Sequence, residues 1–135
     1  MSNAETILTV RQESTWTIEG EVIVRIICSD EGKYHIQRIE KIGFVESDLG
    51  ETGESIQMQR VLPAKRVTQI LDQLRELMIP AAPALEMGSD GGFTELEVGG
   101  YIGKAHYRWW SCPPQGWEGL DRLANDIFKL SETCA

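Results

Sequence analysis

Hydrophobic and polar residues alternate along the first part of the chain, which is the spacing of β-strands. The alternation predicts strands in the segments ILTVR (7–11) and WTIEGEVIVRIICS (16–29). The second segment has apolar positions on both faces: Val22, Val24, Ile26 and Cys28 on one, Ile23 and Ile27 on the other. We therefore expect this strand to lie centrally in its sheet, with both of its faces covered at least in part.

The residues that follow this strand predict a tight turn into an antiparallel strand. SDEGK (29–33) favours a tight turn into a third strand, YHIQRIEKIGF (34–44). An acidic loop then leads to SIQMQRV (55–61), a shorter fourth strand. Four consecutive strands connected in this way predict an antiparallel meander.

The hydrophobic period changes after residue 62 to that of an amphipathic helix. Apolar residues recur at spacings of three and four: Val67, Ile70, Leu71, Leu74, Leu77 and Met78. Pro63 suits the first turn of this helix and Pro80 ends it, which predicts a length of about sixteen residues.

A hairpin and a second helix are predicted for the rest of the chain. FTELEV (93–98) and KAHYRWW (104–110) read as strands joined by the glycine-rich GGYIG. The last helix carries a single apolar face: Trp117, Leu120, Leu123, Ile127 and Leu130. The whole pattern predicts an α+β fold, an antiparallel sheet of about six strands with both amphipathic helices packed on one face.

The two adjacent tryptophans at the end of the hairpin must point to opposite sides of the sheet. Alternation sets Trp109 against the core and Trp110 on the charged face beside Arg108. A tryptophan among charges is a common interface anchor, but sheet twist or a covering loop would also account for Trp110. Trp16 has the same ambiguity, so both stay candidates for partner binding.

Length and composition indicate one domain. A chain of 135 residues with 41% hydrophobic and 25% charged residues fits a single globular domain, here expected over 6–131. Residues 1–5 are expected to be a disordered tail or an expression scar, and 132–135 a frayed tail. Three widely spaced cysteines, and the lack of an apolar run long enough for a signal or membrane span, favour the cytoplasm.

The charge balance narrows the class of partner. A net charge of −8 would repel phosphate backbones, so nucleic acid is not expected to bind. Two stretches, 46–55 and 86–97, contain acidic residues and no basic ones. They are interpreted either as a solvated surface or as a footprint for a basic protein. The footprint centres on four carboxylates: Glu46, Asp48, Glu51 and Glu54.

The sequence does not contain a recognisable catalytic, cofactor or metal motif. Cys112 precedes the last helix, where the helix dipole favours a thiolate, but His106 is too far along an extended strand to serve as its base. Two histidines and three scattered cysteines lack the ligand spacing of a zinc site. We therefore expect neither an enzyme, nor a bound metal, nor a cofactor.

The C-terminal part resembles the ending of many small bacterial α+β proteins. The residues concerned are DGG-F-x-E-L-x-V, then Y-R-W-W, a proline and G-W-x-x-L, all within 90–130. Some proteins of this kind are encoded as antidotes beside secreted toxins. The resemblance implies the fold and a bacterial source.

Two functions are expected from these observations. The first is a non-enzymatic protein-binding domain, most concretely a toxin-neutralising immunity protein whose partner is basic, such as a nuclease toxin. The alternative is a small-molecule or enzymatic pocket between sheet and helices, using Arg25 or Arg38 on otherwise apolar strands. A buried arginine would favour the pocket, and an arginine that reaches solvent would favour the binding domain.

Overall fold

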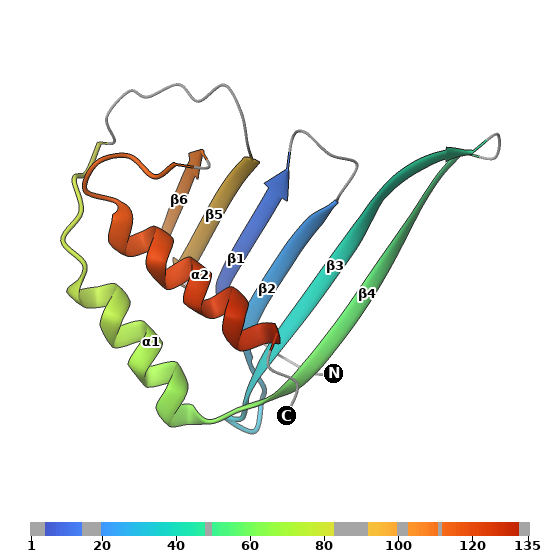
Figure 1. Ribbon diagram of the computed structural model, residues 1–135. Helices are drawn as coiled ribbons and strands as arrows, with labels where there is room; N and C mark the ends of the chain where they lie inside the picture. Colours follow the sequence, from blue (N-terminus) through green and yellow to red (C-terminus); the bar gives the residue numbers. More distant parts are fainter. Residues whose placement is uncertain are drawn as a thin grey trace.

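The computed structural model describes residues 5–14, 20–47, 50–82, 92–99, 103–110 and 112–132, with the backbone alone for residues 14, 42–47 and 50–56. Within these residues the chain forms an antiparallel six-stranded sheet and two α-helices (Figure 1). The strands are β1 (Glu5–Ser14), β2 (Glu21–Cys28), β3 (Tyr34–Ser47), β4 (Gly50–Leu62), β5 (Gly92–Gly99) and β6 (Lys104–Trp110), and the helices are α1 (Ala64–Glu76) and α2 (Glu118–Glu132). The predicted α+β class is confirmed.

The strands lie in the order β4-β3-β2-β1-β5-β6, and each strand is antiparallel to its neighbours. The predicted meander is β1 to β4, and the predicted hairpin is β5 with β6. The hairpin joins the sheet through β5, which pairs with β1 from Leu8 opposite Val98 to Ser14 opposite Gly92. β1 is therefore an inner strand, and β4 and β6 are the two edge strands.

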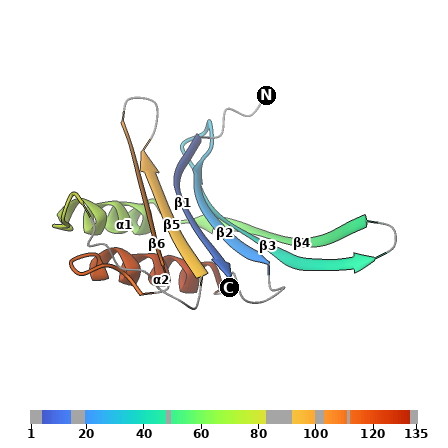
Figure 2. The same ribbon diagram turned by 90° about the horizontal axis from the view of Figure 1, so that it is seen from above.

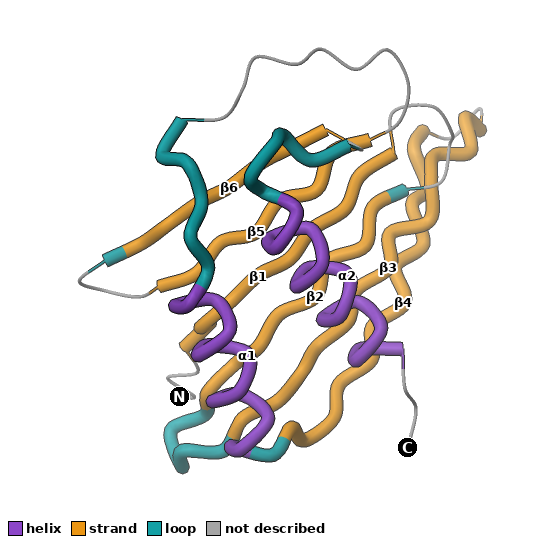
Figure 3. The backbone as a smooth tube through the Cα atoms, turned by 60° about the vertical axis from the view of Figure 1, so that its left-hand side comes forward, coloured by secondary structure: helices purple, strands orange, loops and turns teal. Residues whose placement is uncertain are grey.

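Both helices lie on the same face of the sheet, as predicted (Figure 2, Figure 3). α2 crosses β5, β1, β2 and β3, and α1 runs beside α2. The core between α2 and the sheet is formed by Leu8, Val10, Val24, Ile26, Leu96, Trp109, Leu120, Leu123, Ala124 and Ile127. The opposite side of the sheet is not covered by either helix and is called the open face below.

The central position of β2 is also confirmed. Val24 and Ile26 face the helices and are fully buried. Ile23, on the open face, is only 7% exposed because it lies between Arg11 of β1 and Ile39 of β3 in the strand register. Both faces of this strand are thus covered at least in part.

Side chains from the sheet bind both ends of α2. Near its beginning, the indole Nε1 of Trp109 donates a hydrogen bond to Asp121 Oδ1 at 2.9 Å. Near its end, Arg38 Nη1 donates to Ser131 Oγ at 2.7 Å and to the Phe128 carbonyl at 3.4 Å, and Arg60 donates to the Leu130 carbonyl. Two cations therefore lie at the negative end of the helix dipole, where they are most favourable.

The first helix is shorter than predicted, and the predicted place of Met78 on its apolar face is wrong. α1 spans 13 residues and ends at Glu76, because Leu77 adopts an extended backbone. Leu77 then packs against Gly119 at the start of α2, while Met78 is 94% exposed. The apolar spacing of the helix continues in the sequence through Leu77 and Met78, although neither residue belongs to the helix.

Segment boundaries differ from the predicted ones in three further places. β1 begins at Glu5, inside the expected tail, and α2 extends to Glu132, one residue beyond the expected domain. The predicted acidic loop is not a loop over most of its length. β3 continues to Ser47 and β4 begins at Gly50, so the acidic residues lie on an extended hairpin.

Replacing Gly116 by alanine should destabilise the fold. Gly116 has a φ of +92°, and an added Cβ would lie 2.7 Å from the Pro80 ring, which cannot yield. We expect the free energy of unfolding to fall by about 1–3 kcal/mol in denaturant titrations. Gly103→Ala is the matched control, because nothing lies within 4 Å of a Cβ at that position. Equal losses in the two variants would contradict this account.

Candidate functional site

The acidic residues predicted to contact a partner lie on a two-stranded ribbon that extends beyond the rest of the sheet. β2 pairs with β3 only as far as Glu21 opposite Lys41. Beyond this point β3 and β4 pair with each other alone, through residues 42–47 and 50–54, which we call the acidic ribbon (Figure 1, Figure 2). Glu46, Glu51 and Glu54 belong to it. Asp48 lies outside the described residues.

The strand register of the acidic ribbon sets two glutamate positions opposite each other. Glu46 of β3 is directly opposite Glu51 of β4. Carboxylates at opposed positions repel one another and destabilise a strand pair, and a two-stranded ribbon without a third strand is only marginally stable in water. Opposed glutamate positions in a ribbon of two strands are therefore an unfavourable combination on general grounds.

The tryptophan predicted as an anchor is not adjacent to the acidic ribbon. Trp110 and Arg108 lie on β6, at the opposite edge of the sheet from β4. Four strands separate β6 from β4, which corresponds to a distance of about 24 Å across the sheet. The structure thus separates the predicted site into two places, and Trp16 lies outside the described residues.

Trp110 packs within the open face and is partly buried. Its ring meets the Phe93 ring edge-on, with 4.3 Å between the ring centroids. The Arg108 guanidinium lies 3.9 Å above the centre of the same Phe93 ring. Phe93 therefore links Trp110 to Arg108. The alternation along β6 predicted the face on which Trp110 lies, but it did not predict the contact of Trp110 with Phe93.

The open face carries a network of ion pairs that sequence reasoning missed. Arg11 of β1 contacts Glu21 of β2, Glu13 at 3.0 Å and Glu95 of β5 at 3.8 Å. Glu95 also binds Arg108 at 3.2 Å and His106 at 3.3 Å. Glu95 and Arg108 are directly opposite each other in the register of β5 and β6. Arg11 reaches Glu95 because β1 pairs with β5. These strands are far apart in the sequence, so no local sequence pattern indicates their pairing.

Glu21 is the most strongly held carboxylate of this network. Its side chain is 15% exposed and binds Lys41 at 2.8 Å as well as Arg11. Burial alone raises the pKa of Glu21, but the hydrogen bonds from Lys41 and Arg11 outweigh burial, so its pKa lies below the ordinary value. The hydrogen bond to Glu21 in turn raises the pKa of Arg11.

The thiol and imidazole groups do not converge among the described residues. Cys112 is exposed and precedes α2, as predicted, but α2 begins only at Glu118, so Cys112 is not in the turn next to the helix N-terminus. His106 contacts Glu95 on the open face, and His35 lies opposite Ile27 on β2. In the part of the chain that the structure describes, no hydrogen bond joins Cys112 to a histidine.

Among the described residues, no group of three or more histidine, cysteine, aspartate or glutamate side chains is arranged to hold a metal ion. Neither helix has the length and apolar character needed to cross a membrane.

The arginines proposed for a pocket have different surroundings. Arg38 faces the helices and its side chain is 11% exposed, but its guanidinium is bound by Glu40, Ser131 and the end of α2. Arg25 lies on the open face, opposite Thr9 and Gln37. Arg38, the buried arginine, therefore holds the end of α2, and its N–H groups donate to other groups of the protein.

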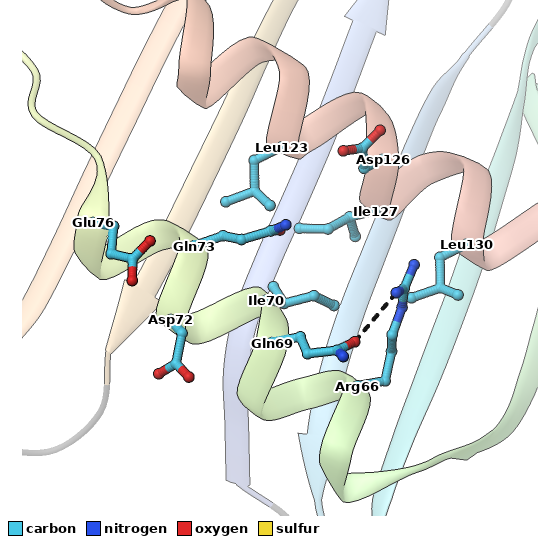
Figure 4. Close-up of a pocket in the computed structure, with 10 residues that line it drawn as sticks. All are labelled: Arg66, Gln69, Ile70, Asp72, Gln73, Glu76, Leu123, Asp126, Ile127 and Leu130. Atoms are coloured by element: carbon cyan, nitrogen blue, oxygen red, sulfur yellow. Dashed lines mark hydrogen bonds between the residues drawn. The ribbon is translucent and has the colours of Figure 1, made fainter.

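A groove does run between the two helices (Figure 4). Its volume is about 410 Å³, and its floor is apolar, formed by Ile70, Leu123, Ile127 and Leu130. Polar residues of both helices line its rim: Arg66, Gln69, Asp72, Gln73, Glu76 and Asp126. The groove lies between the helices and not between helices and sheet, where side chains of the core fill the space.

No known family model matches this chain, and no curated protein sequence is significantly similar to it.

Truncation of the two adjacent tryptophans should have unequal effects. Trp109 is 3% exposed and bonds Asp121, so Trp109→Ala should lower the free energy of unfolding by about 3–5 kcal/mol. Trp110 lies on the open face and is only partly buried, so Trp110→Ala should cost less, about 1–2 kcal/mol. Chemical denaturation of both variants checks the difference, and equal losses would refute the assigned faces.

Neutralising Glu21 should change how stability depends on pH. Because its pKa is lowered in the folded state, its charge stabilises the fold at neutral pH, and this stabilisation is lost as the pH falls through the folded value. We expect Glu21→Gln to cost about 1–2 kcal/mol near pH 7 and progressively less as the pH falls and the Glu21 carboxylate of the parent protein becomes protonated. Glu31→Gln is the control, since the Glu31 side chain is 78% exposed. A Glu21→Gln deficit independent of pH would overturn this interpretation.

Proposed function

We propose that this chain is a non-enzymatic protein-binding domain that docks a basic protein on the acidic ribbon. The observation that carries the proposal is the extension of residues 42–47 and 50–54 beyond the sheet, with Glu46 opposite Glu51. Such a ribbon places acidic positions on two strands beyond the edge of the main sheet. A cationic partner would reduce the repulsion between those carboxylates, so binding and the stability of the ribbon would reinforce each other.

The charge of the segment supports a basic partner in particular. Between Lys41 and Arg60 the sequence contains four carboxylates and not one basic residue. Opposite charges at a distance speed the encounter of two proteins and select against acidic partners. The overall net charge of −8 acts in the same direction.

The most concrete form of this proposal is a bacterial immunity-type protein that neutralises a nuclease toxin. A nuclease surface must be basic to hold a phosphate backbone, and an acidic ribbon is complementary to such a surface. The cytoplasm is the proposed compartment, which suits the free thiols of Cys28 and Cys112. Trp110 and Arg108 would form a separate contact, because they lie on the far edge of the sheet.

Binding is proposed in preference to catalysis because the reactive groups of the open face are already bound to one another. On the open face Glu95 holds both His106 and Arg108, and on the face covered by the helices Arg38 is bound to the end of α2. The alternative, a small-molecule site, is supported by the groove between the helices. Its volume lies in the usual range for small ligands, but its charged groups stand on the rim and do not converge over the floor.

Neutralising the ribbon should slow association with the partner. The variant replaces Glu46, Glu51 and Glu54 by glutamine and Asp48 by asparagine. After recovery of the partner from the native host, we expect its association rate constant to fall by about tenfold or more. The same rate should fall for the unmodified protein as salt shortens the Debye length from about 10 Å at 0.1 M to 3 Å at 1 M.

A second variant with the same net charge as the first distinguishes the effect of the ribbon's carboxylates from the effect of overall charge. It neutralises four exposed acidic residues elsewhere: Asp30, Glu31, Asp72 and Glu76. We expect this variant to bind at nearly the original rate. Equal slowing in both variants, or an association rate that ignores salt, would refute the ribbon as the docking element.

A further inference from the structure

The outer edge of β4 is unlike the edge on the other side of the sheet. β6 is short, and exposed basic residues alternate along it, Lys104, His106 and Arg108. Charges of this kind prevent an edge strand from pairing with other chains. β4 spans 13 residues, contains neither lysine nor proline, and does not pair with any described strand on its outer edge.

The middle of β4 is also neutral and partly apolar. Residues 55–59 are uncharged, and Met58 and Val61 are 39% and 63% exposed. These are two of the three most exposed large apolar side chains among the described residues, and they lie on alternate sides of the same strand. A long edge strand with an uncharged middle and exposed apolar residues is a template for the addition of another strand.

Charge changes from acidic to basic along β4, and this asymmetry indicates which strand could be added to its edge. Its beginning carries Glu51 and Glu54, whereas its end and the start of α1 carry Arg60, Lys65 and Arg66. Antiparallel pairing with an identical strand sets the acidic beginning of each copy against the basic end of the other. Parallel pairing would bring like charges together. The strand is therefore complementary to itself in the antiparallel orientation.

We propose that two copies of this chain pair through β4 across a two-fold axis at Gln57. This register sets Glu54 opposite Arg60 and Ile56 opposite Met58. The attraction does not require a direct contact of Arg60, whose guanidinium also binds the Leu130 carbonyl. The product is one continuous sheet of twelve strands with all four helices on the same side, a closed dimer with a single self-complementary interface. This dimer does not depend on the proposed function.

The first test is the mass of the unmodified protein in solution. Sedimentation or light scattering from low micromolar to submillimolar concentration should show a shift from 15.2 kDa toward twice that mass. A monomer at every concentration would overturn the proposal.

The second test fixes the register by cross-linking. Gln57→Cys is made in a chain whose Cys28, Cys112 and Cys134 are replaced by alanine. Opposed residues of antiparallel strands have Cα atoms about 4.5–5.5 Å apart, which a disulfide can span. We expect mild oxidation to give a covalent dimer. The matched control is Val61→Cys, which is exposed but would lie about 27 Å from its copy, eight residues along the strand. Equal cross-linking at both positions would overturn the register.

The third test uses the two-fold axis and leaves the natural cysteines intact. Gln57→Lys and Gln57→Glu each place two like charges opposite one another, so each should weaken self-association about fivefold. An equimolar mixture of the two variants should recover the association, because opposite charges then meet at the axis. Failure of the mixture to recover, in variants that keep the circular dichroism spectrum of the parent, would contradict the proposal.

Discussion

The burial of one face of α2 against the four inner strands is the contact on which the rest of the structure depends. α2 crosses β5, β1, β2 and β3, and so spans both the meander and the hairpin. The side chains of Leu120 and Ile127 are almost fully buried there. Removal of this much apolar surface from water stabilises the domain more than any polar contact described above. It also holds two sequence-distant parts of the sheet together.

Polar contacts decide where α2 lies along the sheet, because apolar contacts alone have little direction. Trp109 binds its first turn, and Arg38 and Arg60 bind its last carbonyls. With the helices on one face, the open face must satisfy its charges by itself. Arg11 and Glu95 do this by joining strands that neighbour each other only through the pairing of β1 with β5. The ion pairs are thus a consequence of the strand order.

Local periodicity was enough to predict all six strands, both helices and the opposite faces of Trp109 and Trp110. It was not enough where a contact between distant segments decides the outcome. Leu77 leaves α1 to pack on Gly119, so a periodic position became an extended one. The acidic segment was interpreted as a loop because glutamate and glycine are poor strand formers, yet its pairing continues an existing ladder from Lys41. For the candidate site, sequence indicated the acidic residues but could not show that Trp110 lies on the far edge.

The inner position of β1 has a consequence for how the chain folds during synthesis. β1 emerges first and can pair with β2 at once, but its other edge must wait for β5, which is made after the meander and α1 are complete. Until then, Leu8 and Val10 lie on a strand with an unpaired edge and without their covering helix. Folding that waits for such distant pairings is slow and exposes edges to aggregation. The strand order thus gives the domain many contacts between distant parts of the chain, for which slow folding is expected.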